Sequence, residues 1–404
     1  MNAFSLLVVF FLFCGFGNAL SLGEMNSRDP KFVFIFGGQG LEWYSMGRQL
    51  IQNEVVFKDA IFAVSDLVKV LGQPWSLFEE LMASEDESKM AESSVAQLTT
   101  FAVQYATAEL LKSWRLHPAA VLGQSLGECA AACVAGIITL KEAVHLVLIR
   151  STLQDECPKN GRMAAVGMSE DQTRKLLSDL QLSVSLSITA VNDPTSVTVA
   201  GDSQSVNALG QYLKTHAKNT FWRVFGTKRA FHSPHMDIIQ KPFKAAMRQI
   251  KLNPRPSKIP VYSTVEGKAI SGEMFNSDYW WRNIRCPVQL HSALKHMLED
   301  GFQQVIEIST QPMIAYHVKQ IAVQENLGDQ QEWLFVLATL PRKTVPVKEQ
   351  HEFFLLNTVC RLHTLGFTID WSCVNTTSLA KVIREFNYSS LEKTSDTDIG
   401  SLKP

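Results

Sequence analysis

Short apolar runs alternate with longer segments of helical pattern along most of the chain. Residues 32–36 (FVFIF) and 119–123 (AAVLG) are uninterrupted apolar runs, and glycine follows or closes each one. Such runs are typical of parallel strands that are covered on both faces. Between them, residues 95–114 place apolar side chains at helical spacing. Strands that alternate with helices in this way predict an α/β domain with a parallel sheet.

The pattern changes after a break at Pro158 and Gly161. The next segments read as strand, helix, strand, strand, helix and strand, which is the order of a ferredoxin-like unit. We therefore expect an α/β-hydrolase-like large subdomain, residues 31–157 and 229–340, with a small ferredoxin-like subdomain, residues 158–228, inserted into it.

Beyond the small subdomain, the first pattern returns. Residues 259–265 and 302–309 predict strands, and residues 290–298 predict a helix. Residues 278–288 (DYWWRNIRCPV) are interpreted as a loop that leads into that helix. The whole domain is therefore expected to cover residues 31–340.

The sequence after the domain becomes more polar. Residues 341–374 are interpreted as a linker, with a helix at residues 350–365. Residues 375–404 are rich in Ser, Thr and charged residues, so we expect a disordered tail.

The N-terminus has the form of a secretory signal. An apolar run at residues 4–16 precedes the small-residue pattern Gly17-Asn18-Ala19, so residues 1–19 are interpreted as a signal-like segment. The run is short for a membrane span, and no other long apolar span follows it. We therefore expect no membrane span apart from this segment.

Composition narrows the classes of partner. The formal net charge is −1, so no excess of positive charge indicates nucleic acid. The seven cysteines show neither a CxxC pair nor Cys/His zinc spacing. We expect reduced thiols, no bound metal and no nucleic-acid partner.

One serine lies in a pattern typical of a nucleophile. Residues 123–127 read Gly-Gln-Ser-Leu-Gly, which fits G-x-S-x-G after a predicted strand and before an alanine-rich helix. Glycines two positions either side of Ser125 allow a sharp turn that exposes its hydroxyl at the carboxyl edge of the sheet. The helix N-terminus offers free N–H groups to an oxyanion, that of Leu126 among them. A structural serine at a tight turn is the alternative that the pattern leaves open.

A nucleophilic serine needs a base, and the chain has ten histidines. His232 and His235 follow the small subdomain, where the returning chain is expected to border a cleft, and Pro234 fixes the turn between them. His232 is the candidate base and His235 is its rival. Four others in or beside predicted helices, with no cluster of polar residues around them, are interpreted as surface or satisfied core residues: His117, His145, His216 and His317.

Further motifs occur in the order of a known family. They are GGQG at residues 37–40, GQSLGE at 123–128, Arg150 at the family's distance from the serine, AFHSPHM at 230–236 and YWWRNIRCPV at 279–288. The chain therefore resembles the malonyl-CoA:acyl-carrier-protein transacylases. It is most similar to the acyltransferase domains of polyketide synthases and animal-type fatty acid synthases, over residues 32–371. The segment after residue 340 resembles the linker that trails such domains.

The resemblance implies acyl transfer through an acyl-serine intermediate. Ser125 would be the nucleophile and His232 the general base. The backbone N–H groups of Gln39 and Leu126 would form the oxyanion hole.

The resemblance also implies the substrates and partners. Arg150 would bind the free carboxylate of a malonyl group, Gln97 would line the pocket, and the bulk of Phe231 would exclude an α-methyl group. No cofactor would be bound. Malonyl-CoA would be the acyl donor and the phosphopantetheine thiol of an acyl carrier protein the acceptor, with a ketosynthase or other synthase modules as further partners.

Three positions depart from the family's pattern. Gln124 replaces the histidine that usually precedes the nucleophile, Glu42 stands where glutamine is common, and Arg229 stands where the malonyl-selecting version has histidine. A glutamine before the serine resembles acyl hydrolases on this fold, so an acyl-thioester hydrolase is the alternative function, although Arg150 argues against it. A non-catalytic scaffold is disfavoured because serine, histidine and arginine occur together.

The family and the N-terminus point to different compartments. CoA and carrier proteins belong inside the cell, whereas residues 1–19 resemble an export signal. The sequence leaves open the location, and also whether the chain is a free-standing enzyme or part of a larger synthase.

Overall fold

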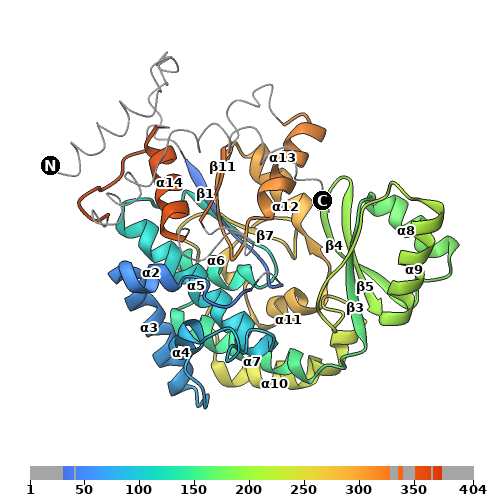
Figure 1. Ribbon diagram of the computed structural model, residues 1–404, viewed down its shortest axis with the longest axis horizontal. Coiled ribbons are helices and arrows are strands. Elements are labelled where there is room, and N and C mark those ends of the chain that lie inside the picture. The colour runs from blue at the N-terminus through green and yellow to red at the C-terminus, as the bar shows by residue number, and fades with distance from the viewer. Residues whose placement is uncertain (1–30, 41, 328–334, 340–350, 365–366, 375–404) are drawn as a thin grey trace.

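The computed structural model describes residues 31–40, 42–327, 335–339, 351–364 and 367–374. The predicted signal-like segment 1–19, residues 341–350 of the predicted linker and the predicted tail 375–404 lie outside these described residues. The described part of the chain forms two sheets, each with its own helices (Figure 1).

The larger sheet has six strands in the order β11-β10-β1-β2-β7-β8. Neighbouring strands run parallel, as the apolar runs predict, except that the edge strand β8 pairs antiparallel with β7. The strands are β1 (Phe32–Phe36), β2 (Ala120–Gly123), β7 (Val261–Ser263), β8 (Lys268–Ile270), β10 (Gln304–Ile308) and β11 (Phe335–Ala338).

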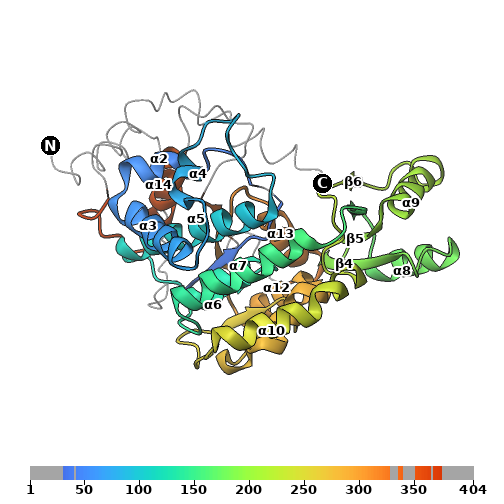
Figure 2. The ribbon, with the colours of Figure 1, turned by 90° about the horizontal axis from the view of Figure 1, so that it is seen from below.

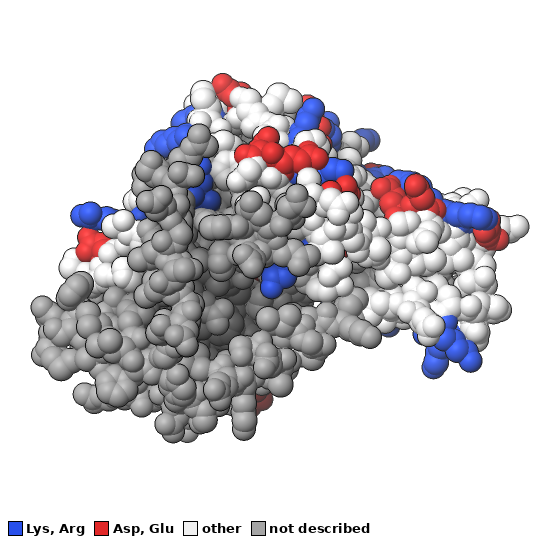
Figure 3. All heavy atoms as spheres, turned by 90° about the horizontal axis from the view of Figure 1, so that it is seen from above, with Lys and Arg blue, Asp and Glu red and all other residues white. Residues whose placement is uncertain are grey.

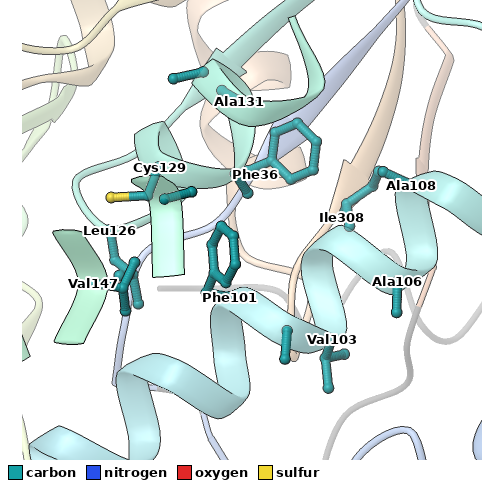
Figure 4. Packing of buried hydrophobic residues seen from close by; sticks show 14 of the residues in the cluster. Phe36, Phe101, Val103, Ala106, Ala108, Leu126, Cys129, Ala131, Val147 and Ile308 are labelled. Carbon is teal, nitrogen blue, oxygen red and sulfur yellow. The ribbon is translucent and has the colours of Figure 1, made fainter. Parts of the chain in front are cut away.

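Alternate residues of β1 face two different hydrophobic clusters, which explains its uninterrupted apolar run. Phe34 and Phe36 belong to the cluster that includes residues of α5 (Ser93–Ser113), α6 (Gly127–Val134) and α7 (Leu140–Glu156). Figure 4 shows this packing around Phe36, Phe101 and Leu126. Val33 and Ile35 belong instead to the cluster of α12 (Leu290–Glu299) and α13 (Ile314–Gln324). Helices thus cover both faces of the sheet.

Further helices complete the large subdomain, and the segment after it packs back onto it. They are α2 (Arg48–Asn53), α3 (Val55–Val70), α4 (Leu77–Met82), η2 (Pro234–Ile239), α10 (Gln240–Ile250), η3 (Gly272–Met274) and α14 (His351–Thr364). Leu355 and Leu356 of α14 are buried in the main cluster. The Trp114 indole N–H donates to the Cys373 carbonyl (3.1 Å). These described parts of the predicted linker therefore share the core of the large subdomain.

The smaller sheet has the strand order β6-β3-β5-β4-β9. Its first four strands pair antiparallel in the ferredoxin-like arrangement that the sequence predicts. The fifth, β9 (Val288–Gln289), comes from the chain beyond the small subdomain and pairs parallel with β4. Figure 2 shows this unit projecting from one end of the molecule. The remaining elements are β3 (Gly161–Val166), α8 (Glu170–Asp179), β4 (Leu186–Asp193), β5 (Ser196–Asp202), α9 (Ser203–His216) and β6 (Trp222–Val224).

A hydrogen bond also ties the two subdomains together. His317 Nδ1 of α13 lies 2.7 Å from Asp193 Oδ2 of β4, and the Asp193 side chain is almost fully buried. His317 is thus a partly buried histidine with a satisfied hydrogen bond, in agreement with its interpretation as a surface or satisfied core residue. The two residues are far apart in sequence, so only the packing of α13 beside β4 brings them together.

The interpretation of residues 278–288 as a loop is wrong. Most of this segment forms α11 (Ser277–Arg285), and the Asn276 side chain caps the helix by accepting the Tyr279 N–H (3.0 Å). Trp280 and Ile284 are buried, whereas Asp278 is exposed. The helix is short and carries a buried asparagine on its apolar face, so the 3.6-residue period is hard to see in the sequence.

Two glycines allow the sharp turn from β2 into α6. A Cβ on Gly127 would lie 2.2 Å from the Phe36 carbonyl oxygen of β1. A Cβ on Gly123 would lie 2.3 Å from the Glu128 Cα. Each distance is far below a normal contact, so the backbone of the turn packs directly against β1 and against itself.

Replacing Gly127 by Ala is therefore expected to destabilise the protein. The added methyl group meets backbone atoms that cannot rotate away, so we expect the free energy of unfolding to fall by about 3 kcal/mol. Urea denaturation followed by circular dichroism measures the change. Gly226→Ala is the matched control, because its Cβ would meet no atom within 4 Å, and its expected change is below about 1 kcal/mol. Equal effects of the two substitutions would contradict this account of the turn.

Candidate active site

Ser125 lies in the turn between β2 and α6 with a backbone φ of 53°. This left-handed conformation is unfavourable for a residue with a side chain and often marks functional sites. The serine is 7% exposed, and its carbonyl accepts the Glu128 N–H (3.1 Å), which continues the turn into the helix. Parallel strands end at this edge of the sheet, where α/β domains commonly bind ligands.

His232 contacts the serine directly. Its Nε2 lies 2.7 Å from Ser125 Oγ, and its Nδ1 lies 3.1 Å from the Cys286 carbonyl oxygen. A carbonyl can only accept a hydrogen bond, so Nδ1 carries the proton and Nε2 accepts from the serine hydroxyl. His232 also has a positive φ, 58°. His235 points elsewhere, with its Nε2 3.8 Å from Asp202 of the small subdomain.

The surroundings keep the His232 imidazole neutral. Burial is the main cause, and the positive charge of Arg150 adds to it, so the pKa of His232 falls from 6.5 to about 3. The hydrogen bond to the Cys286 carbonyl opposes this shift but does not offset it. A neutral imidazole that accepts from a serine hydroxyl can act as a base over a wide pH range.

Arg150 is a buried cation on α7, and it is 1% exposed. Its Nη1 donates to the Asn283 Oδ1 (2.7 Å), while its Nε has no hydrogen-bond partner among the described residues. Burial lowers the pKa of Arg150, and the nearby Cys129 and Glu128 oppose that shift. No carboxylate forms an ion pair with Arg150 in the described part of the chain.

Asn283 of α11 connects the arginine with the serine. Its Nδ2 donates to the Ser125 carbonyl oxygen at 3.0 Å, while its Oδ1 accepts from Arg150. No motif in the sequence singles out Asn283. Its signal is a polar side chain at a buried position of an apolar helix face, and it becomes visible only when residues 277–285 are recognised as a helix.

Glu128 forms a second buried anchor behind the turn. It is 1% exposed and accepts hydrogen bonds from the Thr264 N–H (2.8 Å) and from the hydroxyls of Thr264 and Tyr279. Burial raises the pKa of Glu128 to about 7, although these hydrogen bonds and the charge of Arg150 act in the opposite direction. The contacts hold β7 and α11 against the first turn of α6.

The other predicted pocket residues are also buried. Gln97 is 0% exposed and donates from Nε2 to the Gln154 Oε1 (2.7 Å). Phe231 belongs to the main hydrophobic cluster and directly precedes His232. The backbone N–H groups of Gln39 and Leu126 have no hydrogen-bond acceptor within the described residues. Neither N–H group is therefore engaged by the part of the chain that the structure describes.

Gln124, Glu42 and Arg229, the three residues that depart from the family's pattern, each form hydrogen bonds within the fold. Gln124 accepts the Gly38 N–H (3.4 Å), which ties the turn to the GGQG loop. Glu42 accepts the Gly40 N–H (2.8 Å) and the Thr100 hydroxyl (3.3 Å). These contacts place Gln124 and Glu42 in the support of the loop that carries Gln39.

Arg229 binds the end of α7. Its Nη2 donates to the Asp155 carbonyl (2.6 Å) and its Nε to the Cys157 carbonyl (3.3 Å). A cation there satisfies helix C-terminal carbonyls and complements the helix dipole. Arg229 thus anchors the segment that leads to His232.

Comparison with known proteins identifies the family. The family model described as the acyl transferase domain matches residues 33–357. The chain belongs to the acyl transferase domain family. It is 29% identical over 377 residues to the highly reducing polyketide synthase poxF of Penicillium oxalicum, covering 89% of this chain and 14% of the synthase. It is 32% identical over 348 residues to the erythronolide synthase EryA2 of Saccharopolyspora erythraea, covering 86% of this chain and 9% of that protein.

Solved structures agree with this assignment. The acyltransferase domain from module 8 of the salinomycin polyketide synthase matches with a TM-score of 0.77 and 26% identity, over 85% of this chain and 78% of that one. A loading acyltransferase from the avermectin modular polyketide synthase matches with a TM-score of 0.74 and 28% identity, over 82% and 99%. The protein therefore contains an acyltransferase domain with the expected α/β fold.

The surface of the acyltransferase domain adds little to its functional assignment. On the face shown in Figure 3, acidic and basic side chains are interspersed over the described surface, in agreement with the net charge of −1. No helix in the described ranges is long and apolar enough to cross a membrane. Within the same ranges, no group of three His, Cys, Asp or Glu residues is arranged to hold a metal ion.

The lowered pKa of His232 predicts how the reactivity of Ser125 depends on pH. A histidine with a pKa near 6.5 is about nine-tenths protonated at pH 5.5, whereas one with a pKa near 3 stays neutral there. We expect a sulfonyl fluoride to modify Ser125 at pH 5.5 at about the rate seen at pH 7.5. Intact-mass spectrometry over time measures this rate, and His232→Gln is the control that lacks the base. A rate that falls about tenfold per pH unit below 6.5 would show that burial does not keep the imidazole neutral.

Proposed function

We propose that the domain moves a malonyl group from CoA to the phosphopantetheine thiol of an acyl carrier protein, through an acyl-Ser125 intermediate. The observation that carries this proposal is the combination of a Ser125–His232 hydrogen bond with the buried Arg150 in one site. A nucleophile and base serve acyl transfer, and a buried cation without a carboxylate partner suits an acidic acyl group.

In the first half-reaction, Ser125 Oγ attacks the thioester carbonyl while His232 Nε2 takes the hydroxyl proton. The oxyanion accepts from the N–H groups of Gln39 and Leu126. The intermediate then collapses, the C–S bond breaks, and the proton on His232 goes to the CoA sulfur that leaves.

The second half-reaction runs in the opposite direction with a new thiol. His232 takes the proton of the carrier's phosphopantetheine thiol, and the sulfur attacks the ester carbonyl of acyl-Ser125. When the C–O bond breaks, the proton returns to Ser125 Oγ. The acyl group leaves as a carrier thioester, and the enzyme is restored without a bound cofactor.

Two further residues shape the acyl pocket in this proposal. The bulk of Phe231 beside the base restricts the space next to the α-carbon of the acyl group, which favours malonyl over methylmalonyl. Gln97 of α5 would line the pocket, and its hydrogen bond to Gln154 joins it to α7, the helix that carries Arg150. The expected partners are an acyl carrier protein and a ketosynthase, and CoA chemistry places the domain inside the cell.

The proposal predicts that malonyl-CoA acylates Ser125. We expect intact-mass spectrometry to detect a malonyl adduct on the wild-type protein, and none on Ser125→Ala. Addition of a phosphopantetheinylated carrier protein is expected to remove the adduct and to malonylate the carrier. Rapid loss of the adduct to water, with no gain from the carrier, would support the acyl-thioester hydrolase instead.

Arg150 is expected to set the preference for an acidic acyl group. Arg150→Ala removes the cation but leaves Ser125 and His232, so malonyl transfer should fall about a hundredfold while acetyl transfer changes much less. Initial rates with malonyl-CoA and acetyl-CoA give the two values of kcat/KM. Lys175→Ala, an exposed pair partner of Asp179, is the control for loss of a positive charge. Equal losses with both acyl groups would contradict the assigned role.

A further inference from the structure

The orientation of the Asn283 side chain is determined by its partners. The Arg150 guanidinium can only donate hydrogen bonds, so the atom 2.7 Å from Nη1 is the amide oxygen. The Ser125 carbonyl can only accept, so the atom 3.0 Å from it is the amide nitrogen. Asn283 is 2% exposed, and both of its bonds are shielded from water. A single rigid amide therefore connects the cation with the backbone of the nucleophile.

The partner that Arg150 receives is neutral. A fully buried arginine is normally paired with a carboxylate, which cancels its charge. Here the acceptor is an amide. The nearby Cys129 thiol also interacts with Arg150, and burial keeps that thiol neutral by raising its pKa to about 11. The carboxylate of Glu128 accepts hydrogen bonds from Thr264 and Tyr279 and not from Arg150. The Arg150 Nε also lacks a partner among the described residues. The positive charge is therefore held in position without an ion pair to any carboxylate among the described residues.

We propose that Asn283 is a positioning residue that determines the preference for an acidic acyl group, because it holds Arg150 uncompensated and at a fixed place relative to Ser125. This inference rests on the proposed function. In a malonyl thioester the carboxylate carbon is two bonds from the carbonyl carbon that the serine attacks. The carboxylate can reach the guanidinium while the thioester carbonyl reaches Ser125 Oγ only if the distance between the guanidinium and Ser125 Oγ matches the length of the malonyl group. Asn283 sets that distance.

Asn283→Asp is the sharpest substitution, because it has the same shape. Its carboxylate would pair with Arg150 and cancel the charge, and it would no longer donate to the Ser125 carbonyl. We expect the ratio of kcat/KM for malonyl-CoA to that for acetyl-CoA to fall at least about tenfold, the effect of losing one hydrogen bond to a charged group. Asn283→Ala, which frees Arg150 without neutralising it, is expected to lower the ratio less.

A double substitution tests whether Asn283 acts through Arg150. If it does, Arg150→Ala/Asn283→Ala has the same malonyl-to-acetyl ratio as Arg150→Ala alone, since no positioned cation is left to lose. Independent effects that multiply in the double variant would overturn the proposal. The proposal is also overturned if Asn283→Asp lowers malonyl and acetyl transfer equally, because a purely structural role predicts equal losses.

A matched control separates specificity from helix stability. Asn276→Ala removes the cap of the same helix, where the Asn276 side chain accepts the Tyr279 N–H, but it does not touch Arg150. We expect it to lower the melting temperature and to leave the malonyl-to-acetyl ratio unchanged; a fall like that of Asn283→Asp would overturn the proposal.

Different experimental results overturn the role of Asn283 and the proposed function. A wild-type protein without malonyl preference, or without any acyl-Ser125, overturns both. A wild-type preference that survives Asn283→Asp overturns only the role of Asn283. Sulfonyl fluoride labelling of Ser125 checks that each variant keeps a folded site. If Asn283→Asp is not labelled, the malonyl-to-acetyl ratio of Asn283→Ala becomes the decisive measurement. An unchanged ratio in Asn283→Ala then overturns the proposal.

Discussion

The site depends on one short helix, α11, whose polar groups contact each of its principal parts. Tyr279 donates to Glu128 behind the turn, Asn283 joins Arg150 to Ser125, and the carbonyl of Cys286 at the helix end orients His232. The serine and the histidine lie far apart in sequence and both adopt left-handed backbone conformations. Such strained conformations persist only when surrounding contacts over-determine them, and α11 supplies several of those contacts.

The electrostatic arrangement follows from the same packing. Burial disfavours charge on His232 and on Glu128, so one pKa falls and the other rises. Arg150 remains the group whose charge is hardest to remove, because a guanidinium does not lose its proton in proteins. The result is a neutral imidazole beside a fixed cation. A buried cation of this kind costs free energy in the empty site, and binding of an anionic group would recover part of it.

Structural features that depend on neighbouring residues in the sequence could be predicted from the sequence. The run FVFIF predicts a strand covered on both faces, the strand and helix order after Pro158 predicts the ferredoxin-like unit, and Gly123 and Gly127 predict the sharp turn. The segment DYWWRNIRCPV is the counter-example, since its helix depends on burial of Tyr279 and Trp280 in a core built from distant elements. Local propensity does not encode such burial.

The amino-acid sequence by itself determined the α/β architecture, the two subdomains, the family resemblance and the identity of Ser125, His232 and Arg150 as candidates. The family resemblance favoured His232 over His235, and the tertiary structure showed that His232 contacts the serine while His235 lies near Asp202, because this depends on where the chain returns from the small subdomain. Only the tertiary structure showed that the Cys286 carbonyl accepts from His232 Nδ1, because every residue type carries a backbone carbonyl and the sequence cannot mark this one. Asn283 also emerged only from the fold, because its importance lies in two partners that are distant in sequence and meet through packing.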